Sequence, residues 1–254
     1  MWSGTFEPQS DSASNGWAAD WYFTDRRGGV SREQFESLNL ATHVGDDPSA
    51  VAANRSLVAA TARVEVEHLA VIRAEHGARV HTVAPEAIAD IPLADGLVTN
   101  TPGLALMALA ADCAPVVLAD VEQQVVGVVH CGWRGVVAGI IPAAVDKMVE
   151  SGARAPSIAA VVGPAICRIC YVVDADCAKQ IEAVSPESAG RDADGSWHVD
   201  VAAAVSDSLT GLGIQVQRIA ECTYINPRLF SYRRDHTTGR HSGVVVLRSP
   251  GDLS

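Results

Sequence analysis

The middle of the chain reads Ala111-Asp112-Cys113-Ala114-Pro115-Val116-Val117-Leu118 and then Val128-Val129-His130-Cys131-Gly132-Trp133-Arg134-Gly135. These two apolar runs carry a thiol and an imidazole at matching ends. If residues 120–123 form a two-residue hairpin turn, Leu118 pairs with Val125 and Cys113 lies directly opposite His130. Directly opposed side chains in an antiparallel ladder have Cβ atoms roughly 4.5–5.5 Å apart. We therefore expect the two groups to share a site.

This separation suits two ligands of one zinc ion, and it also suits a nucleophile and its base. A catalytic zinc takes three protein ligands and keeps a fourth position open. His76 is the best third candidate because it lies in a glycine-bounded bend between the expected β segments 69–73 and 79–83. The sequence predicts a zinc site at His76, Cys113 and His130. It leaves open a metal-free thiol enzyme with Cys113 as nucleophile and His130 as base.

The composition limits the class of protein. With 254 residues, 48% of them hydrophobic, the chain can bury a large core, and we expect one catalytic domain over residues 16–254 after a disordered tail over 1–15. The net charge of -11 argues against nucleic-acid and anionic-membrane partners. Apolar stretches break before the ~20 residues that a membrane span needs. We expect a cytoplasmic monomer or homodimer that acts on small molecules.

Hydrophobic spacing predicts an α/β fold with a mixed sheet. The clearest helix runs over 47–62, with Asp47 as N-cap and Pro48 as its first residue. Further helices are expected over 135–150, 174–184 and 200–212, and strands over 21–24, 69–73, 79–83, 158–162, 215–221 and 243–247. The apolar runs 95–99 and 104–118 fit either a helix or a buried strand.

Six cysteines are too few for a disulfide framework in a chain of this length, so we expect free thiols. Cys167 and Cys170 have C-x-x-C spacing, which is typical of redox and structural-zinc sites. We favour a loop near the site instead, because no second pair completes a four-thiolate centre. Cys177 and Cys222 are expected to be packing residues.

Two groups of side chains complete the expected site. Arg134 directly precedes a predicted helix, where its guanidinium and the helix dipole favour a bound anion such as phosphate. Arg233 and Arg234 form a second cationic cluster. Glu75 and Asp112 are the candidates for moving a proton, because each is adjacent in sequence to a predicted metal ligand.

The chain resembles, over residues 21–247, the laccase-domain family of multifunctional purine nucleoside phosphorylases, which has long been described as multicopper polyphenol oxidases. The segments that carry this resemblance are Phe23-Thr24-Asp25-Arg26-Arg27-Gly28-Gly29-Val30-Ser31, Ser37-Leu38-Asn39-Leu40, His43-Val44-Gly45-Asp46-Asp47, Glu75-His76-Gly77, Thr101-Pro102-Gly103-Leu104-Ala105-Leu106, Ala111-Asp112-Cys113, His130-Cys131-Gly132-Trp133-Arg134-Gly135, Gly163-Pro164-Ala165-Ile166 and Phe230-Ser231-Tyr232-Arg233-Arg234-Asp235.

The resemblance implies a compact α/β/α layered domain shared with the catalytic domain of the cytotoxic necrotizing factors. It implies zinc on His76, Cys113 and His130, with copper less favoured. The implied activities are phosphorolysis of adenosine, inosine and methylthioadenosine and deamination of adenosine. Asn39 is expected to contact the nucleoside and Arg134 the phosphate. Some bacterial members are credited instead with removing wrong amino acids from cell-wall precursors.

Two features qualify the resemblance. Cys167 stands where the family usually has glycine, and Val172 stands where it usually has glutamate. A copper polyphenol oxidase is the disfavoured alternative, because one thiolate and scattered imidazoles do not assemble the several copper centres that oxygen reduction needs.

Overall fold

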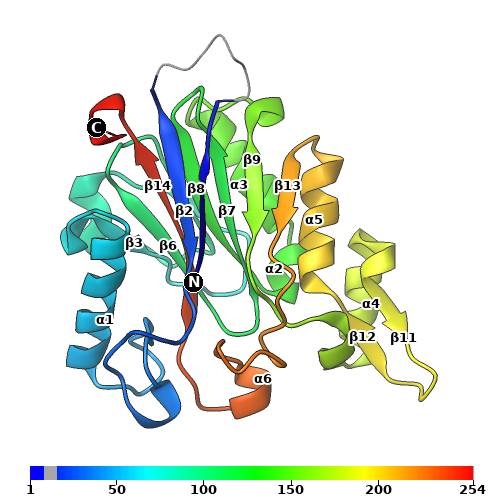
Figure 1. The fold of residues 1–254 in the computed structure, drawn as a ribbon. Coiled ribbons are helices and arrows are strands. Elements are labelled where there is room, and N and C mark those ends of the chain that lie inside the picture. The colour runs from blue at the N-terminus through cyan, green and yellow to red at the C-terminus, as the bar shows by residue number, and fades with distance from the viewer. Residues whose placement is uncertain (9–15, 254) are drawn as a thin grey trace.

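Two β-sheets packed face to face form the centre of the molecule (Figure 1). The structure is a computed structural model and describes residues 1–8 and 16–253. The five-stranded sheet has the order β1 (Trp2–Phe6), β2 (Ala18–Phe23), β14 (His241–Arg248), β6 (Ala105–Ala110) and β3 (Leu69–Val71). The six-stranded sheet has the order β13 (Gln215–Arg218), β9 (Ala159–Val162), β7 (Ala114–Asp120), β8 (Val125–Cys131), β5 (Gly96–Thr99) and β4 (Val80–Thr82).

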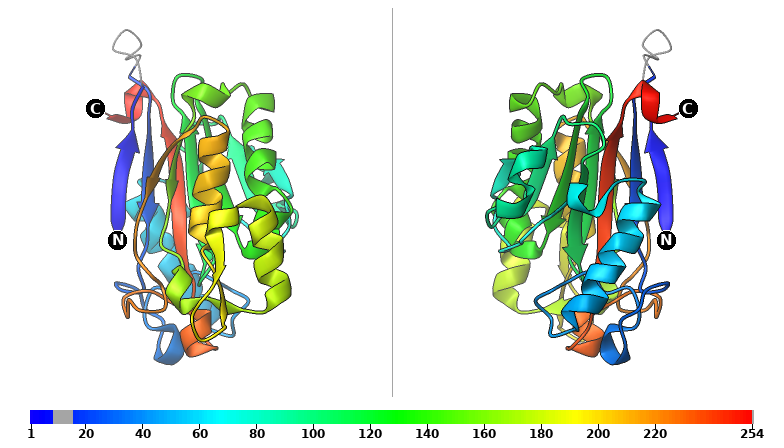
Figure 2. Two further views of the ribbon diagram at one scale, coloured as in Figure 1. Left: turned by 90° about the vertical axis from the view of Figure 1, so that its right-hand side faces the viewer. Right: turned by 90° about the vertical axis from the view of Figure 1, so that its left-hand side faces the viewer.

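Helices cover the outer faces of both sheets. Helix α1 (Pro48–Thr61) packs Val58 against the five-stranded sheet. Helices α3 (Ile140–Glu150) and α5 (Val201–Gly211) pack against the six-stranded sheet and lie on the side of the molecule opposite β1 (Figure 2). The remaining elements are α2 (Trp133–Val137), α4 (Ala175–Val184), α6 (Tyr232–Asp235) and a small sheet of β10 (Val172–Val173), β12 (Trp197–Val199) and β11 (Ala189–Arg191).

The α/β class and the mixed strand directions are confirmed, since each large sheet combines parallel and antiparallel pairs. The expectation of one mixed sheet is corrected to two. The reason lies in residues 104–118, which form β6 and β7 in different sheets. Both strands are buried on both faces, so neither shows the alternation that would separate it from a helix. The likeness to the cytotoxic necrotizing factors stays a prediction.

The predicted disordered tail over 1–15 is wrong for its first part. Residues 2–6 form β1, which pairs with β2 in antiparallel register from Trp2 opposite Phe23 to Phe6 opposite Ala19. Phe6 also packs its ring against Trp21. The segment was predicted to be disordered because its Ser and Gly residues are typical of loops. It nevertheless pairs as an edge strand. Residues 9–15 of the tail lie outside the described residues.

The helices follow the sequence signals closely, with one exception. The Asp47 side chain accepts the N–H of Ser49 and begins α1 at Pro48, as predicted. The single helix expected over 135–150 is two helices, α2 and α3, because Gly139 between them adopts a left-handed backbone at φ 82°. Within the described residues, no helix combines the length and the apolar character needed to cross a bilayer.

Two chain crossings between the sheets determine where the site lies. Strands β3 and β6 pair in parallel, so their carboxyl ends lie at the same end of the five-stranded sheet. From these ends the chain crosses to the six-stranded sheet through residues 72–79 and 111–113. The antiparallel hairpin brings the carboxyl end of β8 beside the start of β7. Three distant parts of the sequence therefore meet at one edge of the two-sheet core.

Candidate active site

His76 lies on the first crossing, in a left-handed backbone conformation at φ 63°. The carboxylate of Asp95 holds this conformation, because the N–H groups of His76 and Gly77 each donate to it at 2.8 Å. Asp95 is fully buried. A non-glycine residue keeps such a backbone only where its surroundings enforce it. The bend expected between the two β segments is thus present, and a buried anion organises it.

Cys113 and His130 converge in a register that differs from the predicted one. The β7–β8 turn has four residues, 121–124, so Asp120 pairs with Val125, and Pro115, not Cys113, lies opposite His130. The Asp120 carboxylate stabilises this longer turn by accepting the N–H of Gln123 at 3.1 Å. A shift of two positions preserves the face on which a side chain lies. The two groups consequently still approach one another.

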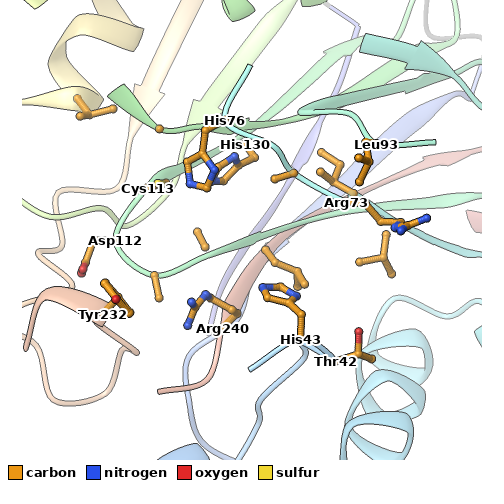
Figure 3. Close-up of a pocket in the computed structure, with 18 of the residues that line it drawn as sticks. Thr42, His43, Arg73, His76, Leu93, Asp112, Cys113, His130, Tyr232 and Arg240 are labelled. Carbon is orange, nitrogen blue, oxygen red and sulfur yellow. The ribbon is translucent and has the colours of Figure 1, made fainter. Parts of the chain in front are cut away.

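The three predicted ligands form one cluster. The side-chain ligand atoms of His76, Cys113 and His130 all lie within 4.8 Å of one another. The two imidazole rings are perpendicular, with centroids 4.7 Å apart, and both point toward Cys113 (Figure 3). Gly132 leaves the space for them, because a Cβ there would lie 2.9 Å from Cδ2 of His76 and 3.2 Å from Sγ of Cys113. The cluster depends on this glycine.

Asp95 also contacts the His130 ring, a role that the sequence analysis missed. Its Oδ1 lies 3.1 Å from Nδ1 of His130, and its main-chain carbonyl accepts the His130 N–H at 2.7 Å. A carboxylate on one ring nitrogen fixes the tautomer and leaves the other nitrogen for a ligand, as in many metal sites. The only signal in the sequence for this role is that an acidic residue directly precedes the apolar run 96–99.

The cluster favours a charged thiolate and a charged imidazole. Burial disfavours the Cys113 thiolate, but the charge of His130 and hydrogen bonds from both histidines outweigh burial and lower the pKa of Cys113 to about 6. Burial likewise disfavours the imidazolium of His130, but the Cys113 thiolate and Asp95 raise the pKa of His130 to about 9. Between these values the metal-free pair is a thiolate beside an imidazolium.

Alkylation of Cys113 in metal-free protein should therefore reach half its maximal rate near pH 6. As the pH falls, the Cys113 thiolate stays deprotonated until the pH reaches about 6. An ordinary cysteine thiolate is already protonated below roughly pH 8.5. His130→Ala removes the stabilising charge and should move the midpoint toward the ordinary value. Mass spectrometry of iodoacetamide-treated protein measures the rate, with Cys113→Ser as the control for other thiols. A wild-type midpoint near pH 8.5 would contradict the ion pair.

Asp95→Asn should lower metal affinity by about 10- to 100-fold, the effect typical of removing a carboxylate behind a metal-bound histidine. Competition with a chelator measures this affinity. Asp192→Asn is the matched control, since Asp192 lies 3.3 Å from Nε2 of His198 in a carboxylate–histidine pair outside the cluster. Equal affinities for the two variants would show that Asp95 does not orient a ligand.

The cluster opens into a cavity of about 950 Å³. Trp133, Tyr171 and Tyr232 contribute aromatic surface to its wall. Asp112 and Tyr232 line the side next to Cys113, and His43 and Arg240 lie across the cavity from the two histidines (Figure 3). The space is large enough for a purine-sized ligand together with a small anion.

Four arginines give this cavity a positive lining in a chain whose net charge is -11. They are Arg55, Arg73, Arg233 and Arg240. Among the side chains that the structure describes, which leave out those of residues 9–15, 89–90 and 253–254, none of the four has a carboxylate partner at ion-pair distance. Burial, together with the charges of Arg240 and Arg55, lowers the pKa of His43. The lining is therefore suited to an anion.

Three residues expected at the site lie elsewhere. Arg134 is exposed, stacks on the Trp133 ring at 4.5 Å and does not line the cavity. Asn39 is fully buried, and its amide bonds Ala41, Asp46 and the N–H of Arg240. Glu75 pairs with Arg79 at 3.2 Å outside the cavity lining. Asn39 thus supports Arg240 from behind, and Arg240 lines the cavity whereas Arg134 does not.

The chain is similar to known proteins over most of its length. Residues 20–248 match the family described as multi-copper polyphenol oxidoreductase laccase. A purine nucleoside phosphorylase of Streptomyces coelicolor is 44% identical over 89% of this chain and 94% of its own length. The purine nucleoside phosphorylase YlmD of Bacillus subtilis is 32% identical over 89% of this chain and 87% of its own length. Such relatives support an enzyme of the purine nucleoside phosphorylase kind.

Solved structures show the same fold. The hypothetical protein YfiH of Bacillus licheniformis has a TM-score of 0.84 at 30% identity, covering 91% of this chain and 93% of its own. YlmD from Geobacillus stearothermophilus has a TM-score of 0.82 at 30% identity, covering 94% of each chain. Because the family model matches nearly the whole sequence, the chain belongs to the laccase-domain family, and its relatives in Streptomyces coelicolor and Bacillus subtilis are named purine nucleoside phosphorylases.

Proposed function

We propose that this protein is a zinc-dependent purine nucleoside phosphorylase that acts on adenosine, inosine and methylthioadenosine and also deaminates adenosine. The observation that carries the proposal is a His76–Cys113–His130 cluster opening into a cavity with a positive lining. The names of the relatives supply the reaction class. The specific nucleosides come from the resemblance of the sequence motifs to the family.

The donor set fits zinc. Two imidazoles and one thiolate are borderline-soft ligands of the kind that zinc takes in catalytic sites, and three protein ligands leave one position open. Asp95 on Nδ1 of His130 and the space at Gly132 are the supports that such a set needs. When bound, zinc supplies Lewis acidity and lowers the pKa of water to roughly 7.

The arginines of the cavity would hold the phosphate for phosphorolysis. In this step a phosphate oxygen forms a bond to C1′ of the ribose, and the bond from C1′ to the purine N9 breaks. Arg240 is the strongest candidate, because it lies across the cavity from the two histidines, is half-buried, and has its main-chain N–H held by Asn39 (Figure 3). In the described residues its side chain donates from Nη1 to the carbonyls of Thr238 and Gly239. Its remaining donors are available to a phosphate oxygen.

Asp112 is the carboxylate that would move a proton during deamination. It lines the cavity, and its two oxygens accept from the Thr223 hydroxyl at 2.5 Å and the Arg233 N–H at 2.7 Å. These bonds fix the carboxylate beside Cys113. As water adds to C6 of the purine, Asp112 would take a proton from that water and then pass it to the amino group, which leaves as ammonia when the C6–N bond breaks. Glu75, the other candidate, is held outside the cavity by Arg79.

The test is to incubate metal-quantified protein with adenosine, inosine, methylthioadenosine and a muropeptide precursor, each with and without phosphate, and to identify products by mass. We expect free base and a ribose phosphate only with phosphate, and inosine from adenosine without it. Zinc-free, copper-loaded and zinc-loaded samples distinguish the metals. Full rates in zinc-free protein would reject zinc dependence. Oxidation of phenols that scales with copper would favour the polyphenol oxidase alternative.

A second candidate is a metal-free thiol amidase that edits cell-wall precursors. The observation that favours it is the line of Cys113, His130 and Asp95, which has the order of a nucleophile, its base and the group that orients the base. Cleavage of the muropeptide precursor by zinc-free protein, with loss of activity after alkylation of Cys113, would support this candidate. Cleavage of nucleosides alone would exclude it.

A further inference from the structure

Three more cysteines form a second cluster, apart from His76, Cys113 and His130. Cys167 and Cys170 lie on the connection that follows β9, and Cys222 lies on the connection that follows β13. Their Sγ atoms all lie within 4.8 Å of one another. The expectation that Cys222 is only a packing residue is therefore corrected. Because Cys222 is distant in sequence, the C-x-x-C pair lacked an evident third ligand.

Backbone pairing between the two connections fixes this arrangement. The Ala165 N–H donates to the Glu221 carbonyl at 3.3 Å, and the Thr223 N–H donates to the Ala165 carbonyl at 3.2 Å. The Cys167 N–H donates to Sγ of Cys222 at 3.3 Å, and a hydrogen bond of this kind stabilises a thiolate. The path of the main chain thus brings the three cysteines together.

The chemistry of three converging thiols is specific. Thiolates select zinc and Cu⁺ among biological metal ions. A tetrahedral zinc with Zn–S bonds of about 2.3 Å places its sulfur ligands roughly 3.8 Å apart, which small side-chain rotations reach from the observed separations. All six cysteines are free thiols, and the three in this cluster are half-buried. An ion can enter, and solvent or a small ligand can complete its coordination.

We propose that Cys167, Cys170 and Cys222 bind one thiophilic metal ion, Zn²⁺ or Cu⁺, separate from the His76–Cys113–His130 cluster. The two connections that carry these cysteines lead into the cavity wall. The first contributes Tyr171 and the second leads to Arg233, which stacks on the Tyr171 ring at 4.9 Å and donates from Nη1 to the Val172 carbonyl at 2.7 Å. The bound ion joins the two halves of this wall.

Metal stoichiometry tests the proposal independently of catalysis. Reduced, metal-free protein is loaded with Zn²⁺, or anaerobically with Cu⁺, then desalted, and its metal is counted by inductively coupled plasma mass spectrometry. We expect two equivalents in the wild type, one in Cys222→Ser, one in Cys170→Ser and one in His76→Ala. Cys222→Ser combined with His76→Ala should bind none. Cys177→Ala, which removes a buried cysteine of α4 outside both clusters, should keep two.

Thermal unfolding and substrate kinetics show what the ion does. Free metal at a hundredfold excess over its Kd should raise the Tm of His76→Ala by about 5–10 °C, and this rise should be absent when Cys222→Ser is added. In otherwise wild-type protein, Cys222→Ser should raise KM more than it lowers kcat, because the cavity wall loosens while the His76 cluster remains.

Two results would overturn the proposal. One is equal metal content in wild type and in both cysteine variants. The other is an intact mass lower by two hydrogens after loading, which would show that two of the thiols form a disulfide in place of binding metal. The zinc dependence of the proposed function fails separately, if His76→Ala retains full nucleoside phosphorylase activity. Retention of one equivalent by that variant would then still support the three-cysteine site.

Discussion

His76→Ala is expected to lose its equivalent of zinc at the His76–Cys113–His130 cluster and at least about 10³-fold in both phosphorolysis and deamination, since the Lewis acid of such a site contributes several kcal/mol to the transition state. The expected loss is large because two ligands do not hold a catalytic zinc firmly. Metal analysis and the rates of both reactions on the same preparation measure it.

The fold should survive this substitution, because His76 lies on an exposed bend that Asp95 holds through backbone N–H groups. His68→Ala, which removes an exposed histidine outside the cluster, is the matched control and should keep zinc and activity. Full activity of His76→Ala without bound zinc would refute zinc dependence and favour a mechanism in which Cys113 and His130 act without a metal.

Arg240→Met is expected to reduce kcat/KM for phosphate by about 10²–10³-fold, because one or two charge-assisted hydrogen bonds contribute about 1.5–3 kcal/mol each. Deamination of adenosine without phosphate should stay within about threefold of wild type, since that reaction does not use the phosphate subsite. Steady-state kinetics with phosphate as the varied substrate separates the two effects. This difference between the reactions is what distinguishes a phosphate contact from general damage to the cavity.

Two arginines outside the cavity lining provide comparisons. Arg191→Met removes an exposed arginine that lies over Trp197 at 5.6 Å and should change neither reaction. Arg134→Met tests the original expectation, because Arg134 also stacks on a tryptophan but lies in the first turn of α2, near the cluster. A larger loss of phosphorolysis in Arg134→Met than in Arg240→Met would assign the phosphate to Arg134.

Local signals in the sequence were reliable where neighbouring residues determine the structure. Asp47 and Pro48 begin α1 because a side-chain cap and a fixed φ act within one turn. The bend at His76 was predicted from Gly77. The hairpin was predicted, but its register was wrong, because Asp120 stabilises a four-residue turn that no Asn-Gly or Asp-Gly pair announces.

Long-range pairing limited the rest of the prediction. Strands β6 and β7 are apolar on both faces, so their sequence does not reveal that they belong to different sheets. Asp95 and Arg240 are chemically ordinary in the sequence, and their roles come from contacts with residues far along the chain. For the same reason, the sequence did not predict that Cys222 lies beside Cys167 and Cys170, which are on another connection.

The sequence alone predicted which residue types form the His76–Cys113–His130 cluster, because a thiol and imidazoles at the ends of apolar segments are typical of a reactive site. It also determined most helices and strands, whose hydrophobic periodicity and caps are local properties. The pairing of two sheets, the buried carboxylate behind His130, the arginines around the cavity and the three-cysteine cluster required the folded chain. Each of these features combines residues that are far apart in the sequence, and only the register of the sheets and the packing of the core bring such residues into contact.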